Sequence, residues 1–199
     1  MSAVLFADDI EFLQRSLCSA GFYATPFSKE FDTQTDLGEQ KFFSLCEEIA
    51  SQAAQFDQRS ERNIRTLHPS AQRLARRFLS TVRDAGIDAR IISGTRTYAE
   101  QNLLFRKGRF GNPPPRVTNA KGGESNHNFA IAWDIGIFDN GAYLPESPLY
   151  ERAAEIGLVD GIEWGGNWKT FKDRPHYQLA TGLTAAQVRE KFEQGQAFV

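Results

Sequence analysis

Two short stretches of the sequence carry side chains that could bind a metal ion and hydrolyse a bond. His127 lies seven residues before Asp134, and Asp173 lies three residues before His176. Two imidazoles and a carboxylate, with one position open to water, are typical of a catalytic zinc site. A further carboxylate is what hydrolysis needs, because it takes a proton from the attacking water and passes it to the leaving amine. On spacing alone, a surface histidine or an Asp–His salt bridge explains the same residues.

The residues around Asp134 favour a metal ligand. Residues 129–138 are expected to form a strand, in which alternate side chains point to opposite faces. One face would carry Ala130, Ala132, Asp134, Gly136 and Phe138, and the other Ile131, Trp133, Ile135 and Ile137. A single carboxylate among small side chains must be paired or bind a cation. A turn at residues 126–129 would bring His127 back over Asp134.

Several blocks of the sequence resemble the signature of the VanY-like zinc peptidases of the cell wall, peptidase family M15. They are SNHNFAIAWDIG at 125–136, WGGNW at 164–168 and DRPHYQ at 173–178, preceded by SGTRTYAEQ at 93–101. The resemblance covers roughly residues 65–182. It is closest to the L-alanyl-D-glutamate endopeptidases, of the phage endolysin and bacterial cell-wall hydrolase type.

This resemblance implies a role for each matching residue. It implies Zn²⁺ on His127, Asp134 and His176, with Asp173 as the general base and acid. Arg96 would stabilise the oxyanion or clamp a substrate carboxylate, since a guanidinium fork suits either task. The implied substrate-binding residues are Arg96, Gln101, Ser125, Trp164 and Trp168. Among these, Gln101 would be a supporting hydrogen-bond partner, Ser125 could instead cap its turn, and both tryptophans could instead pack in the core.

Ala130 departs from the family pattern, which usually has glycine at this position. A positive φ at Ala130 would therefore bring local strain.

The predicted function is a zinc-dependent peptidoglycan hydrolase that cleaves the stem peptide at L-Ala–D-Glu by metal-activated water. A D-Ala-D-Ala carboxypeptidase of the same family is the alternative, and a non-catalytic zinc-bearing wall-binding module is a further one. Asp173 argues against the last, because a binding module needs no proton shuttle.

Charge and hydropathy exclude some partners. The formal net charge of −2 gives no basic surface of the kind that nucleic-acid binding needs. No stretch approaches the roughly 18 apolar residues of a membrane span. The N-terminus does not read as a secretory signal, so we expect synthesis in the cytoplasm and action on the wall after release through a phage pore or a secretion system. An immunity protein or an export partner is left open.

The segments around these residues predict an α+β protein. The expected fold is a small antiparallel sheet flanked by helices, the Hedgehog/DD-peptidase-like zinc fold that the resemblance implies. Helices are expected at 8–21, 36–54, 69–85, 97–107 and 149–156 and from 184 onwards, and strands at 89–93, 129–138 and 176–179. The polar stretch SQAAQFDQRSERN at 51–63 is expected to be a linker or an exposed helix end, and 108–126 a long loop.

The chain is expected to divide near residue 60. Residues 1–60 would form a helical N-terminal extension, part of which resembles small peptidoglycan-binding domains, and residues 61–199 the zinc peptidase catalytic domain. Cys18 and Cys46 are expected to be small buried hydrophobes, with a disulfide as the minority alternative.

Overall fold

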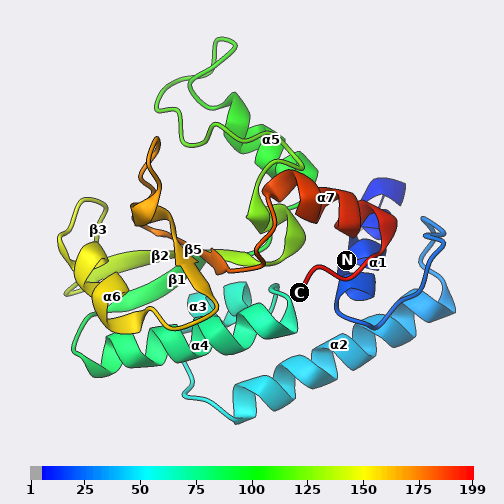
Figure 1. Ribbon diagram of the computed structural model, residues 1–199, viewed down its shortest axis with the longest axis horizontal. Coiled ribbons are helices and arrows are strands. Elements are labelled where there is room, and N and C mark those ends of the chain that lie inside the picture. The colour runs from blue at the N-terminus through cyan, green and yellow to red at the C-terminus, as the bar shows by residue number, and fades with distance from the viewer. Residues whose placement is uncertain (1–5) are drawn as a thin grey trace. The chain divides into compact units, whose positions relative to one another are not determined.

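The computed structural model describes residues 6–199 and confirms the α+β class (Figure 1). The helices are α1 (Ala7–Ser19), α2 (Thr33–Ser51), α3 (Gln58–Ile64), α4 (Pro69–Asp84), α5 (Tyr98–Arg106), α6 (Leu149–Gly157) and α7 (Ala185–Gln194). Two 3-10 turns are η1 (Asn126–Phe129) and η2 (Gly165–Asn167). The strands are β1 (Ala89–Ser93), β2 (Ala132–Asp139), β3 (Ala142–Leu144), β4 (Ile162–Trp164) and β5 (His176–Leu179).

The chain forms two compact units, each assembled from separate stretches of sequence. The first comprises Met1–Ser44, described from Phe6, together with Arg96–Phe129 and Gly182–Val199. The second comprises Leu45–Thr95 and Ala130–Thr181. The predicted division of the sequence near residue 60 is a different partition, and it stays a prediction.

The second unit contains the sheet, which is small and antiparallel as expected. Its strand order is β1-β2-β5-β4, and β3 pairs with the free end of β2. The residues predicted to face the core are fully buried: Ile131, just before β2, and Trp133, Ile135 and Ile137 within it. The strand begins at Ala132 and not at Phe129, because Asn126–Phe129 form the turn η1.

Helix α4 packs against this sheet. Pro69 occupies its first turn, where a missing N–H costs nothing, and the His68 ring accepts a hydrogen bond from the Ser70 N–H. Its buried Phe78 ring lies 4.3 Å, centroid to centroid, from the Tyr177 ring of β5. His68 therefore caps the start of α4.

The expectation of a linker or an exposed helix end at residues 51–63 is wrong from residue 58 onwards, since α3 begins there. Asp57 caps this helix by accepting a hydrogen bond from the Ser60 N–H. Glu61 forms two hydrogen bonds to the guanidinium of Arg76, which is almost completely buried. Polar side chains thus point inward as well as outward, which a reading by hydrophobic pattern does not detect.

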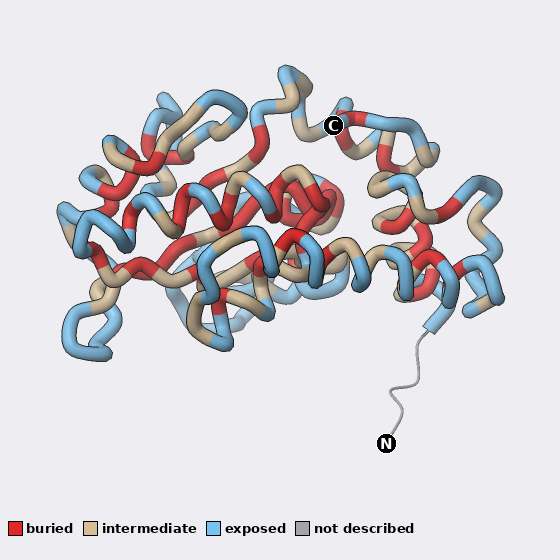
Figure 2. Tube along the Cα trace, turned by 90° about the horizontal axis from the view of Figure 1, so that it is seen from below, coloured by how far each residue is buried: buried red, intermediate tan, exposed pale blue. Residues whose placement is uncertain are grey.

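The first unit has an aromatic core around α7. Phe192 of α7 lies 5.8 Å from Phe12 of α1 and 5.5 Å from Phe129 of η1, between ring centroids. Thr97 and Thr184 begin α5 and α7 with capping boxes. In Figure 2, buried and exposed residues alternate along the helices, the pattern of amphipathic packing.

Both cysteines are free. Cys46 is buried and Cys18 is half-buried. Burial raises the pKa of both thiols, so neither is an activated nucleophile.

Candidate active site

Asp134 and His176 face each other across two paired strands. They are direct partners in the antiparallel register of β2 and β5. The His176 Nδ1 lies 3.2 Å from a carboxylate oxygen of Asp134. Because residues opposite each other in a sheet project to the same face, the register itself brings the two side chains together.

The His176 imidazole is enclosed and polarised by its neighbours. The residue is buried, with 5% of its surface exposed. Its Nε2 lies 3.0 Å from the Gln178 Oε1. Burial by itself lowers the pKa of His176, but the hydrogen bond and charge of Asp134 outweigh it, so the pKa is raised above its ordinary value.

His127 lies in η1, a short turn held by backbone contacts. It is 2% exposed. Its carbonyl oxygen accepts a hydrogen bond from the Arg96 N–H at 3.0 Å. The next residue, Asn128, donates from its side chain to the Arg96 carbonyl at 2.8 Å and from its backbone to the Ser125 carbonyl. The segment before α5 therefore fixes the position of η1.

His127, Asp134 and His176 form a group that could hold a metal ion. Each offers one ligand atom, and these atoms all lie within 4.8 Å of one another. Two imidazoles and one carboxylate fit zinc and also suit other transition metals.

Asp173 starts a tight turn that leads into β5. Its N–H donates to the Gly165 carbonyl at 3.0 Å, and its carbonyl accepts from the His176 N–H at 3.2 Å. The side chain is half-buried, and its negative charge adds to the raised pKa of His176. The predicted general base is therefore tied to the same backbone turn as His176.

Gly165 is a positioning residue that the sequence reasoning did not assign. A Cβ at this residue would lie 2.5 Å from the Asp173 carbonyl oxygen and 3.1 Å from the His176 Cβ. The neighbouring Gly166 is equally restricted, since a Cβ there would lie 2.2 Å from the Trp164 ring. The two glycines of WGGNW were the available signal, because close backbone approach is a common reason for glycine.

Arg96 is held by Gln101 in the first unit. Its Nη1 donates to the Gln101 Oε1 at 2.9 Å. Gln101 is fully buried and donates in turn to the Ala120 carbonyl at 3.0 Å. This geometry is that of a supporting residue, and the direct substrate contact predicted for Gln101 stays a prediction.

The two tryptophans differ in their surroundings. Trp164 donates from its ring nitrogen to the Arg174 carbonyl at 2.8 Å and stacks on Tyr177. Trp168 is 37% exposed, and its ring centroid lies 4.9 Å from that of His176. Trp168 is thus placed to contact a ligand near His176, whereas Trp164 packs within its own segment.

Ala130 has a positive φ of 59°. This left-handed conformation costs a non-glycine residue about 1–2 kcal/mol. The carbonyl of Ala130 accepts the His68 N–H at 2.8 Å, which helps to hold the conformation. The strain expected for a positive φ is therefore present two residues before β2.

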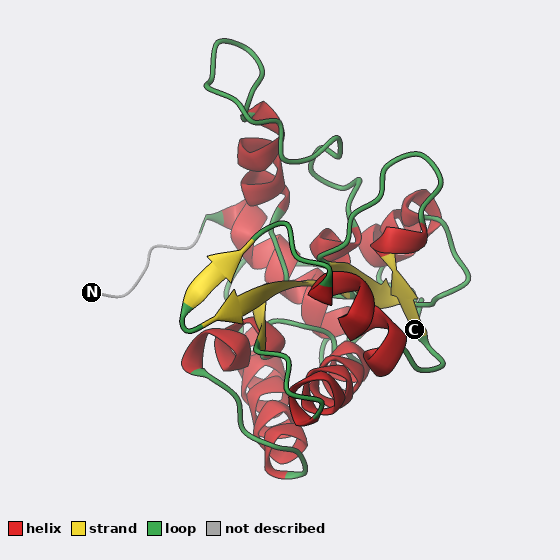
Figure 3. Cartoon of the chain, turned by 90° about the vertical axis from the view of Figure 1, so that its left-hand side faces the viewer, coloured by secondary structure: helices red, strands yellow, loops and turns green. Residues whose placement is uncertain are grey.

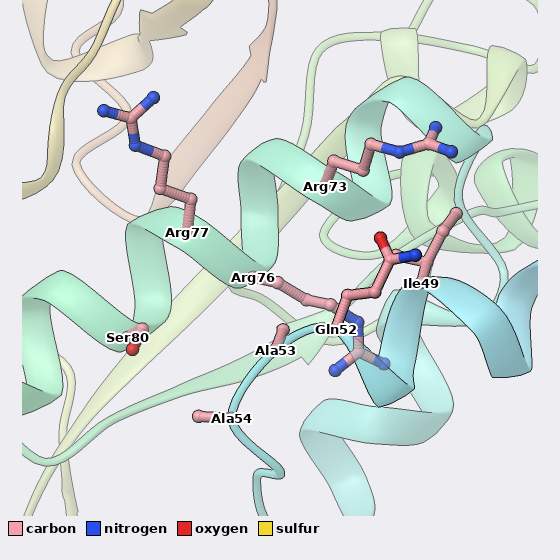
Figure 4. Close-up of a pocket in the computed structure, with 8 residues that line it drawn as sticks. All are labelled: Ile49, Gln52, Ala53, Ala54, Arg73, Arg76, Arg77 and Ser80. Carbon is pink, nitrogen blue, oxygen red and sulfur yellow. The ribbon is translucent and has the colours of Figure 1, made fainter.

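The second unit also has a cavity of about 420 Å³ at the end of α2 and along α4 (Figure 4). None of the predicted site residues lines it. The side chains of Arg73, Arg76 and Arg77 run in different directions in Figure 4, and Arg76 is paired with Glu61. The cavity therefore offers no converging set of groups for catalysis.

The sequence is similar to those of known peptidases. Residues 118–179 match a peptidase family M15 model described as D-alanyl-D-alanine carboxypeptidase. The chain is 34% identical over 125 residues to the peptidoglycan L-alanyl-D-glutamate endopeptidase CwlK of Bacillus subtilis (strain 168), covering 57% of this chain and 73% of that protein. A crystal structure of the Serratia marcescens L-Ala D-Glu endopeptidase ChiX is similar with a TM-score of 0.48 and 30% identity, over 67% of this chain and 95% of that one. The chain belongs to peptidase family M15 and is a metallopeptidase.

Proposed function

We propose that this chain is a zinc-dependent peptidoglycan hydrolase that cleaves the stem peptide between L-Ala and D-Glu. The observation that carries the proposal is the pairing of Asp134 with His176, with a ligand atom of His127 within 4.8 Å of both. The bond is chosen from the similarity to CwlK, whose name specifies it.

His127, Asp134 and His176 are proposed to hold the metal. A zinc ion bound there supplies Lewis-acid polarisation of the scissile carbonyl and lowers the pKa of water. The close packing around His176 keeps its ring in place and limits access of solvent. The Gln178 Oε1, which accepts from the His176 Nε2, and the carboxylate of Asp134 orient the imidazole, as partners of metal-binding histidines generally do.

Asp173 is proposed to take the proton from the attacking water and to deliver it to the leaving amine of D-Glu. Its place in the turn before His176 supports this role, because the backbone bonds to Gly165 and His176 fix where the carboxylate starts. A half-buried carboxylate remains able to exchange protons with a substrate.

Arg96 is proposed to bind a substrate carboxylate or the developing oxyanion. Gln101 would keep the guanidinium in one orientation, which lowers the entropy lost when a ligand binds. Trp168 and Ser125 are proposed to contact the stem peptide. Trp164 is proposed to contact it only through the edge of its ring, because the ring is packed against Tyr177.

The substrate places the activity at the cell wall. None of the described helices is long and apolar enough to cross a membrane. We also propose delivery through a phage pore or a secretion system. Residues 1–60 are proposed to form a helical N-terminal extension, and residues 61–199 the catalytic domain. An immunity protein or an export partner is a further part of the proposal.

A D-Ala-D-Ala carboxypeptidase is the second candidate, because the matching family model carries that description. Mass spectrometry of the fragments that purified protein releases from peptidoglycan distinguishes the two. New L-alanine C-termini with free D-glutamate amines, abolished by a chelator, are the expected result. Released D-alanine would establish the carboxypeptidase, and no product despite bound metal would favour the wall-binding module.

A further inference from the structure

Residues 103–121, which comprise the end of α5 and the loop after it, have an unusual concentration of positive charge. We call this segment the basic loop. Its cations are Arg106, Lys107, Arg109, Arg116 and Lys121, and there is no Asp or Glu between residues 101 and 123. The whole chain, by contrast, has a net charge of −2. The basic loop is therefore a local positive region on an acidic protein.

The basic loop is held in shape by its own hydrogen bonds. The Gly108 N–H donates to the Pro113 carbonyl at 2.9 Å, and Arg109 donates to the Thr118 carbonyl at 2.9 Å. Gly108 has a φ of 66°, and a Cβ there would lie 2.8 Å from Arg116. Figures 1 and 3 both show this loop extending past the end of α5. Hydrogen bonds between its outgoing and returning segments thus order the basic loop.

The basic loop also exposes large apolar side chains. Phe110 is 79% exposed, Leu103 61% and Val117 47%. Phe110 has a positive φ of 53°, a conformation that costs a bulky residue free energy. Its ring lies 6.4 Å from that of Phe105, over which the Arg109 guanidinium is stacked at 4.2 Å. The backbone therefore holds an exposed aromatic ring next to Arg109 and beside the Phe105 ring, over which Arg109 and Lys121 both lie.

We propose that the basic loop docks on the surface of an anionic phospholipid membrane. Apolar side chains flanked by Lys and Arg suit this interface, because the rings enter the boundary of the acyl chains while the cations remain among the headgroups. A soluble polyanion would engage the cations and leave Phe110 and Val117 in water, so it accounts for only half of the surface. The inference does not depend on the bond that the enzyme cleaves.

Flotation of the full-length protein with vesicles tests the proposal. Vesicles of equal parts phosphatidylglycerol and phosphatidylcholine are expected to carry the protein, and vesicles of phosphatidylcholine alone are not. Phe110→Ser is expected to weaken the partition about tenfold or more, because it withdraws one aromatic ring from the apolar layer. Lys107→Gln is expected to weaken it about fivefold, since it removes one charge near the headgroups.

Phe31→Ser and Lys41→Gln are matched controls, because both residues are exposed and lie outside the basic loop. Both are expected to float like the wild type, and all four variants are expected to keep the far-UV circular dichroism of the folded protein. Equal flotation of Phe110→Ser and wild type would overturn the proposal. So would complete displacement by soluble polyphosphate with no dependence on Phe110, which would identify a polyanion site, or an absence of binding to either vesicle.

Discussion

The backbone of Gly165 lies against the backbone of Asp173. If Gly165 carried a Cβ, that atom would lie only 2.5 Å from the Asp173 carbonyl oxygen. The Asp173 N–H donates to the Gly165 carbonyl at 3.0 Å, so the two chain segments are joined at this point. The WGGNW block therefore acts on the site through the backbone of the turn that leads to His176.

Gly165→Ala is expected to displace this turn. The added methyl cannot be accommodated without moving backbone, which costs about 1–3 kcal/mol of stability and moves the Asp173 carboxylate. We expect at least a tenfold loss in kcat/KM on a stem-peptide substrate, measured beside the denaturant midpoint. Asn167→Ala, an exposed change in the same block, is the control. Normal activity in Gly165→Ala would show that the turn tolerates the shift.

Asp173→Ala is expected to keep zinc and lose hydrolysis. The three proposed ligands remain, whereas the proton acceptor is removed, and such a group contributes about 10²–10⁴ in rate. Metal content by mass spectrometry and digestion of peptidoglycan measure the two effects separately. Asp139→Ala, at the exposed end of β2, is the matched control. Loss of metal together with activity would mean that the base is misassigned.

Arg96 and Gln101 are expected to act as one unit. Gln101→Met keeps the volume but removes the Oε1 that accepts from Arg96. We expect both Gln101→Met and Arg96→Ala to lower kcat/KM, and the double variant to be little worse than Arg96→Ala alone. Asn102→Ala serves as a control, because its side chain accepts from Gly122 and not from Arg96. Additive losses would separate the two residues functionally.

Ala130 is expected to accept glycine and to reject valine. Glycine removes the cost of the positive φ but also a buried methyl, so the two effects nearly cancel, and a stability change within about 1 kcal/mol is expected. A β-branched side chain at a φ of 59° has no relaxed conformation, and Ala130→Val is expected to lose about 2 kcal/mol or more. Thermal melts of the two variants test this. Equal stability of valine and alanine would contradict the left-handed backbone.

Asp32 is expected to make the stability of the folded protein depend on pH in the acidic range, below the ordinary pKa of an aspartate. Hydrogen bonds from the Thr35 side chain and backbone, and from Ser28, lower the pKa of Asp32 from 3.8 to about 2. A lowered folded-state pKa contributes stability that is present above pH 3.8 and is lost as the pH falls through about 2. Melting temperatures across this range should fall more steeply for the wild type than for Asp32→Ala. Parallel curves would show that the carboxylate contributes nothing.

Local patterns were enough to locate most elements of the second unit. The apolar run Ala89–Ser93 and the Pro175-limited strand His176–Leu179 have the predicted bounds, because short buried strands depend on residues adjacent in the chain. The polar stretch containing α3 was misread, since Asp57 and Glu61 gain their roles from capping and from an ion pair with the distant Arg76.

The sequence by itself determined the family, the types of the candidate ligands and the inward face of β2, because residue identity and alternation are local properties. Only the tertiary structure decided that Asp134 stands opposite His176, that Gln101 holds Arg96, that Gly165 touches Asp173 and that Ala130 is left-handed. These features come from strand register and from the close approach of segments that are separated along the chain. No pattern of neighbouring residues encodes them, because they depend on which surfaces are buried together when the chain folds.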